Sequence, residues 1–145
     1  MNGLPSAPAE LDAATAGALV QAARGVRERA YAPYSGFAVG AALLDEHGRI
    51  HTGVNVENAA YPQGLCAEAS ALAQLVSSGS RRIMAVAVVG QADEPVTPCG
   101  GCRQKLREFA SPQVPVLVAD MQSLRARFTM DQLLPASFGP AHLLP

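Results

Sequence analysis

The sequence of 145 residues lacks several features that would each define a class of protein. It has no long run of lysine and arginine, and its formal net charge is −1, so no nucleic-acid partner is expected. The sequence contains no uninterrupted stretch of roughly 18 or more apolar residues, which is the length that a membrane-spanning helix needs. The N-terminus has neither the basic start nor the apolar stretch of a signal peptide. Small neutral substrates therefore fit the chain better than polymers.

Cysteine is also scarce, and its three positions lie in two tight clusters. The clusters are Cys66-Ala67-Glu68 and Pro98-Cys99-Gly100-Gly101-Cys102. An odd number of cysteines, two of them in a C-x-x-C arrangement, argues against a secreted disulfide framework. We therefore expect a reducing compartment, the cytoplasm.

Three thiolates suit Zn²⁺, and a tetrahedral ion with three protein ligands keeps a fourth position open for water. If Cys66 begins a helix, Glu68 lies in its first turn and can reach that water. A second helix start would present Cys99 and Cys102, and both helix dipoles would favour the anionic thiolates. A zinc ion with such ligands, a proton-transferring Glu and a P-C-x-x-C element is the signature of zinc deaminases.

C-x-x-C alone is equally compatible with a redox pair or with half of a structural zinc site. A structural site normally has four protein ligands, and the sequence has no fourth cysteine. The histidines, His47, His51 and His142, lie outside the clusters and are expected to face solvent. The open zinc site is thus favoured over the closed one.

The order of hydrophobic patterns predicts one α/β domain over residues 10–145, after a flexible Pro/Ala/Gly/Ser-rich tail at 1–9. Helices are expected from Leu11 to before Ala32-Pro33, over 66–78 and over 102–110. Strands are expected over 37–44, 50–56, 83–89, 114–118 and 125–129, the first two as a hairpin. Thr129 and Gln132 have the spacing of a capping box for a last helical turn. Strand-helix-strand order implies a sheet with parallel portions and helices on both faces.

Five segments together resemble the small, homotetrameric cytidine deaminases. They are 34–43 (YSGFAVGAAL), 53–59 (GVNVENA), 66–68 (CAE), 98–104 (PCGGCRQ) and 133–140 (LLPASFGP). The resemblance covers about residues 31–140. It implies a three-layer α-β-α fold with a central mixed sheet of about five strands. It also implies hydrolytic deamination of cytidine and 2′-deoxycytidine to the uridines in pyrimidine salvage, by a homotetramer with active sites near the subunit interfaces.

The same resemblance implies roles for individual residues. Cys66, Cys99 and Cys102 would hold one zinc ion per chain, which activates the water that attacks C4 of cytosine. Glu68 would take a proton from that water, deliver it to N3 and help protonate the departing amine. The substrate-binding residues would be Asn55 and Glu57 at the ribose 3′-hydroxyl, Phe37 and Ala67 near the base, and Phe138 in a neighbouring subunit's pocket.

Four of the substrate-binding residues also have a simpler interpretation. Phe37 on an apolar strand is ordinarily a core residue, and polar Asn55 and Glu57 on one strand face are ordinarily solvated. Phe138 would then cover only its own protomer's surface. Arg103 and Lys105 are expected to be helix-surface charges or ion pairs rather than substrate ligands.

One position departs from the family pattern. The residue after the catalytic glutamate is commonly an arginine that hydrogen-bonds the thiolates, and here it is Ala69. Zinc with three thiolates carries a formal charge of −1, which weakens its acidification of water. Our hypothesis is that the helix N-termini, together with Arg103, supply the missing compensation.

Other functions share parts of this pattern. A deaminase for a nucleoside-like antibiotic such as blasticidin S has the same metal motifs, but the Asn55-Val56-Glu57-Asn58 segment favours a ribonucleoside. A non-catalytic zinc-binding module would leave Glu68 without a task. An RNA- or DNA-editing deaminase is disfavoured by the near-neutral charge and the short chain.

Overall fold

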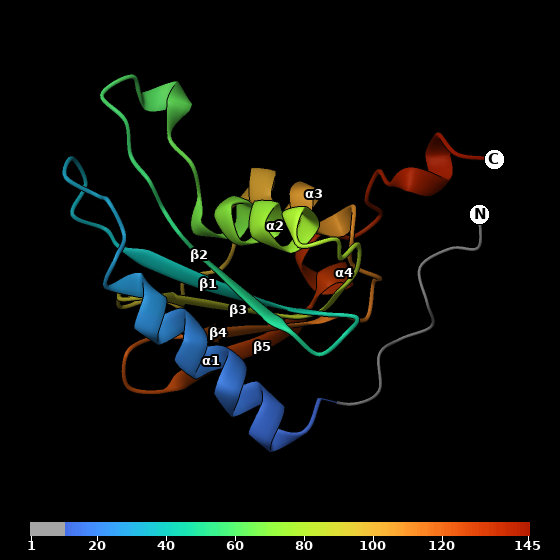
Figure 1. Ribbon diagram of the computed structural model, residues 1–145, viewed down its shortest axis with the longest axis horizontal. Helices are drawn as coiled ribbons and strands as arrows, with labels where there is room; N and C mark the ends of the chain where they lie inside the picture. Colours follow the sequence, from blue (N-terminus) through green and yellow to red (C-terminus); the bar gives the residue numbers. More distant parts are fainter. Residues whose placement is uncertain (1–10) are drawn as a thin grey trace.

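The computed structural model describes residues 11–145, so the predicted tail at 1–9 lies outside the described residues. Its centre is a five-stranded sheet in the order β2-β1-β3-β4-β5 (Figure 1). The strands are β1 (Val39–Asp45), β2 (Ile50–Val54), β3 (Ile83–Gly90), β4 (Pro115–Ala119) and β5 (Leu124–Thr129). β3 and β4 are parallel and the other neighbouring pairs are antiparallel, which confirms the predicted mixed sheet and hairpin.

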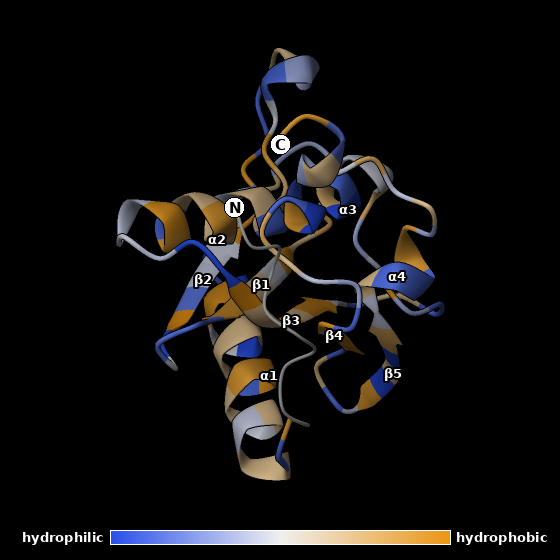
Figure 2. Cartoon of the chain, turned by 90° about the vertical axis from the view of Figure 1, so that its right-hand side faces the viewer, coloured by the Kyte–Doolittle hydropathy of each residue, from blue (hydrophilic) through white to orange (hydrophobic). Residues whose placement is uncertain are grey.

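Helices cover both faces of the sheet, as predicted. Helix α1 (Ala13–Arg27) packs on one face, while α2 (Ala67–Ser77) and α3 (Gly100–Arg107) lie on the other (Figure 1). Figure 2 shows the central strands mostly in the hydrophobic colour between these layers. β3 is buried along nearly its whole length because both layers cover it. The result is the three-layer α-β-α arrangement.

The ends of the helices follow local chemistry. The Asp12 carboxylate caps α1 by accepting a hydrogen bond from the Thr15 N–H at 2.7 Å, and α1 ends well before the Ala32-Pro33 step. The predicted capping box at Thr129 and Gln132 is present and begins the short helix α4 (Met130–Leu133). Two single 3₁₀ turns, η1 (Tyr61–Gln63) and η2 (Pro140–His142), lie in the connecting and C-terminal segments. Among residues 11–145, no helix is both long enough and apolar enough to cross a membrane.

Two glycines allow the helices to approach the sheet closely. A Cβ atom at Gly53 of β2 would lie 2.3 Å from the Ala71 nitrogen and 2.6 Å from the Ala67 oxygen of α2. A Cβ atom at Gly40 of β1 would lie 2.1 Å from the Ala23 oxygen of α1. Only glycine fits at such contacts, and the contact at Gly53 sets where α2 begins relative to the sheet.

The expectation that His51 faces solvent is wrong. Its side chain is buried beneath the α2 layer, with Nε2 2.8 Å from Oδ2 of the buried Asp45. On β2, the side covered by α2 carries His51 and Gly53, whereas the apolar residues Ile50 and Val54 are only half-buried. A polar residue is tolerated there because the Asp45 carboxylate satisfies it. His47 and His142 are exposed, as expected.

Candidate metal centre and nucleoside site

The starts of α2 and α3 bring the three cysteines together. Cys66 is the N-cap of α2, Cys99 is the N-cap of α3, and Cys102 lies in the first turn of α3. Both N-caps have extended backbone and make no side-chain capping bond, which leaves their thiols available. Residues separated by 33 positions thus meet because α2 and α3 share one face of the sheet. The predicted pair of helix starts is confirmed.

The spacing of the sulfur atoms fits a single zinc ion. The three Sγ atoms lie within 4.8 Å of one another, and those of Cys66 and Cys99 are 3.8 Å apart. A tetrahedral zinc ion with Zn–S bonds of about 2.3 Å needs sulfur atoms about 3.8 Å apart. Cys102 is buried while Cys66 and Cys99 are exposed, so the cluster is open on one side. The donor set therefore suits one zinc ion per chain with a free coordination position.

The electrostatics of the cluster also favour a cation. Burial raises the pKa values of the Cys66 and Cys102 thiols, and the nearby Cys99 and Glu68 charges raise them further. Burial also opposes ionisation of Cys99, but hydrogen bonding to the Cys102 backbone and to the neighbouring thiols leaves its pKa below the ordinary value. Three thiolates this close repel one another, and a divalent ion compensates that repulsion.

The hypothesis that Arg103 hydrogen-bonds the thiolates in place of the arginine missing at position 69 is wrong. Its guanidinium donates to the Pro98 oxygen at 2.7 Å, the Leu133 oxygen at 2.8 Å and Thr97 Oγ1 at 3.0 Å. Arg103 thus ties the loop before α3 to the end of α4. The part of the hypothesis that concerns helix N-termini remains, because the Cys102 backbone favours the Cys99 thiolate.

Glu68 occupies the first turn of α2, two residues after Cys66, and is 5% exposed. Its burial raises the pKa of the carboxyl group above the usual value, and the charge of Lys105 acts in the opposite direction. A carboxyl group in such surroundings exchanges protons near neutral pH more readily than an exposed one. Ala67, between Cys66 and Glu68, is buried against the core.

Asn55 and Glu57 follow the end of β2 and bind the segment that leads into β1. The Asn55 amide donates to the Phe37 oxygen at 2.7 Å and accepts from the Val39 N–H at 2.9 Å. The Glu57 carboxylate accepts from the Tyr34 N–H at 2.9 Å and from the Ser35 N–H at 3.1 Å and its hydroxyl. Glu57 has a pKa below its ordinary value because of the Ser35 bonds. Both side chains retain hydrogen-bonding capacity toward a ligand.

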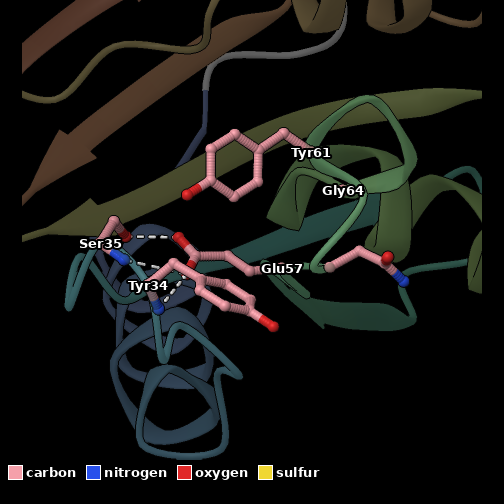
Figure 3. A pocket seen from close by; sticks show the side chains of 6 residues that line it. Tyr34, Ser35, Glu57, Tyr61 and Gly64 are labelled. Carbon is pink, nitrogen blue, oxygen red and sulfur yellow. Dashed lines mark hydrogen bonds between the residues drawn. The ribbon is translucent and has the colours of Figure 1, made fainter.

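Glu57 also lines a pocket of about 350 Å³. Figure 3 shows its carboxylate beside the rings of Tyr34 and Tyr61, whose centroids are 5.9 Å apart in an edge-to-face arrangement. The other lining residues are Ser35, Asn58 and Gly64. Sequence reasoning did not single out Tyr34, Ser35 or Tyr61. The first two lie inside the recognised 34–43 segment, whereas Tyr61 follows an irregular loop and carries no periodic signal.

Phe37 is 39% exposed, so it is not a core residue. Phe138 is 56% exposed on the segment after α4, and its backbone oxygen accepts from Gln104 of α3 at 2.9 Å. That C-terminal segment and the loop between β2 and α2 lie on opposite sides of the helical layer (Figure 1). The structure therefore groups the cysteines with Glu68, and Phe37 with Asn55 and Glu57, whereas Phe138 lies on the C-terminal segment and is bonded to α3.

Three thiols at two helix starts, a buried carboxylate in the first turn and one open side define a zinc-dependent hydrolytic centre on a three-layer α/β fold.

Comparison with known proteins specifies this class further. The family model described as "Cytidine and deoxycytidylate deaminase zinc-binding region" matches residues 14–118. A cytidine deaminase of Sporosarcina psychrophila is 43% identical over 125 residues, which cover 86% of this chain and 92% of that protein. The crystal structure of cytidine deaminase from Burkholderia pseudomallei aligns with a TM-score of 0.79 and 44% identity, covering 84% of this chain and 98% of that one. The chain belongs to the cytidine and deoxycytidylate deaminase family.

A second solved structure, of cytidine deaminase from Mycobacterium tuberculosis, aligns with a TM-score of 0.73 and 39% identity over 85% of this chain and 96% of that one. These alignments span nearly the whole described fold, so the resemblance noted in the sequence extends to the three-dimensional arrangement.

Proposed function

We propose that this chain catalyses the hydrolytic deamination of cytidine and 2′-deoxycytidine to uridine and 2′-deoxyuridine, with release of ammonia, in pyrimidine salvage. The observation that carries the proposal is the buried Glu68 two residues from Cys66, in a three-cysteine cluster of a chain from this family. We place the enzyme in the cytoplasm because its cluster needs three reduced thiols.

Zinc, when bound by Cys66, Cys99 and Cys102, supplies the Lewis acidity that makes water a nucleophile near neutral pH. In the overall reaction, water adds across the C4–N3 bond of cytosine, the C4–amine bond then breaks, and ammonia leaves. Glu68 accepts a proton from the attacking water and delivers it to N3. It then moves the proton of the new C4 hydroxyl to the amine, so that the C4 carbonyl forms as the C4–amine bond breaks and ammonia leaves. Its raised pKa suits both directions of transfer.

The nucleoside is held by the segments around β1 and β2. We assign the ribose 3′-hydroxyl to Asn55 and Glu57, since the Asn55 amide has a second hydrogen and the Glu57 carboxylate has free lone pairs. Phe37 and Ala67 contact the base. Because Asn55 is fixed by two bonds to the β1 segment, its position is set before the substrate arrives.

The active enzyme is a homotetramer in this proposal. The metal ligands Cys66 and Cys99 are exposed in the single chain, and large apolar side chains are exposed on the surrounding loops and on the C-terminal segment. They are Tyr31, Tyr34, Phe37, Val56, Tyr61, Leu65, Phe138, Leu143 and Leu144. Exposed apolar residues that form a contiguous patch mark an interaction site, and we propose that these residues lie at the subunit interfaces. Phe138, which is exposed on the C-terminal segment, would contact substrate bound to a neighbouring copy.

The test is the loss of ultraviolet absorbance when the purified zinc-loaded protein is mixed with cytidine, 2′-deoxycytidine, free cytosine or blasticidin S. We expect turnover of the two nucleosides and little turnover of free cytosine, because only the nucleosides carry the ribose hydroxyl that Asn55 and Glu57 would bind. Turnover of blasticidin S alone would replace the proposed substrate, and no turnover of any compound would contradict the proposed activity. Light scattering should give the mass of four chains.

A further inference from the structure

The exposed ring of Phe138 has an aromatic partner within its own chain. The Phe138 and His142 rings are stacked, with centroids 4.8 Å apart and planes inclined by 14°. Both residues are exposed, so burial in the core does not impose this arrangement. Offset stacking at this distance is a favoured geometry for two planar rings.

The backbone beneath Phe138 is fixed from α3. Arg107 Nε donates to Ser137 Oγ at 2.8 Å, and Gln104 Nε2 donates to the Phe138 oxygen at 2.9 Å. Ala136 has φ 51°, a left-handed conformation that a non-glycine residue keeps only where its surroundings impose it. These contacts fix the position of the Phe138 backbone, but the direction of its ring depends on the side-chain torsions.

His142 is itself held by the turn that follows Phe138. Its Nδ1 atom lies 3.1 Å from the Gly139 nitrogen, which donates to it, and 3.1 Å from the Gly139 oxygen. Helix η2 begins at Pro140, whose fixed φ restricts the turn. The imidazole is therefore a restrained surface against which the phenyl ring can rest.

We propose that His142 is a positioning residue for Phe138, which holds the phenyl ring in the orientation that contacts a nucleoside bound to a second copy of the chain. The inference rests on the proposed function, and in particular on an active site completed by a neighbouring subunit. A ring already restrained loses less conformational freedom when it meets the base. The restrained ring lowers KM and leaves kcat unchanged, because Phe138 makes the same contact with the nucleoside in the ground state and in the transition state.

The first test compares His142→Ala with His142→Phe in the zinc-loaded enzyme, using cytidine as substrate. We expect His142→Ala to raise KM about two- to tenfold with kcat unchanged, as loss of one aromatic stack predicts. His142→Phe, which restores a planar ring without the imidazole, should return KM toward the wild-type value. An unchanged KM in His142→Ala of an active enzyme would overturn the inference. So would a raised KM that His142→Phe fails to lower.

Two further measurements separate positioning from a general effect on folding. In a Phe138→Ala background, His142→Ala should change KM by less than about twofold, because the ring that it positions is gone. A full effect there would overturn the inference.

The sequence has no tryptophan, so Phe138→Trp introduces a single indole. Its emission should change when His142→Ala is added to Phe138→Trp, because the stacking partner is then removed, and identical emission would overturn the inference. If the wild-type enzyme deaminates no nucleoside, the proposed function fails, whereas this emission test is independent of activity.

Discussion

The Sγ atoms of Cys66 and Cys99 lie 3.8 Å apart, although 33 positions separate the two residues in the chain. The distance equals the edge of a ZnS₄-type tetrahedron to within the spread of such sites. Their meeting depends on how α2 and α3 pack on the sheet. Metal binding and the native arrangement of these helices are therefore coupled.

This coupling predicts that zinc removal destabilises the fold. Treatment with a strong chelator should lower the melting temperature by about 10 °C, since a ligand at about a thousand times its Kd contributes about 4 kcal/mol. Thermal unfolding followed by circular dichroism measures the change, and added zinc should reverse it. An identical melting curve for zinc-loaded and chelated protein would show that the cluster does not couple to stability.

Gly53→Ala should be strongly destabilising, because its Cβ would meet α2 backbone atoms at 2.3 and 2.6 Å. We expect a loss of about 3 kcal/mol or more in the free energy of unfolding, measured by urea denaturation. Gly25→Ala is the matched control. Gly25 lies inside α1, and among residues 11–145 no atom outside its own stretch of helix lies within 4 Å of the added Cβ, so alanine should stabilise by about 0.5–1 kcal/mol. Equal effects of the two substitutions would contradict the close approach of α2.

Asp45 predicts an acid-dependent stability. Burial favours its neutral form, but hydrogen bonds from Ser80, His51 and the Arg49 backbone outweigh burial and hold the pKa of Asp45 well below its ordinary value. A carboxyl group with a lowered pKa stabilises the fold above its unfolded pKa of about 4, and this contribution is lost as pH falls further.

Asp45→Asn should therefore lower the free energy of unfolding at pH 7 by about 3 kcal/mol, since it leaves a buried network with a missing charge. The difference from wild type should shrink as the pH falls below about 4. Denaturant titrations between about pH 7 and pH 3 measure it, with the exposed Asp93→Asn as control. If the difference in free energy of unfolding between wild type and Asp45→Asn does not depend on pH, the charge of Asp45 does not stabilise the β1–β2 hairpin.

Glu57→Gln tests the assignment of the ribose contact. Replacing a charged acceptor should lower kcat/KM for cytidine about 10- to 100-fold. With 3′-deoxycytidine as substrate, the same substitution should have much less effect, because the hydroxyl group is already absent. Steady-state kinetics with both nucleosides give the comparison. Equal losses on both substrates would assign Glu57 only to fixing the Tyr34–Ser35 turn that it bonds.

Most of the fold follows from patterns visible in the sequence. The unbroken apolar run at 83–89 predicted β3 because a strand covered on both faces has no polar side. Thr129 and Gln132 predicted the last helix because capping is a local interaction. The meeting of the three cysteines was also predictable, since two helix starts that carry closely spaced thiols can present them to one ion.

The remaining features depend on contacts between distant segments. His51 looked like a solvent-facing strand residue because the hairpin alone does not show that its neighbour Asp45 is buried together with Ser80, 35 positions further along the chain. Arg103 lies beside Cys102 in the sequence, but its guanidinium donates to three oxygen acceptors and not to a thiol. The stack of His142 on Phe138 likewise requires a turn whose geometry is set by α3.

In the proposed mechanism, Cys66, Cys99 and Cys102 bind zinc while Glu68 transfers protons without being a ligand. The most direct measurement is zinc content and cytidine turnover in Glu68→Ala and Cys99→Ser, side by side. We predict that Glu68→Ala keeps roughly one zinc ion per chain and loses turnover, whereas Cys99→Ser loses the zinc, the turnover and part of its stability. Equal zinc loss in the two variants, or undiminished turnover in Glu68→Ala, would contradict the account.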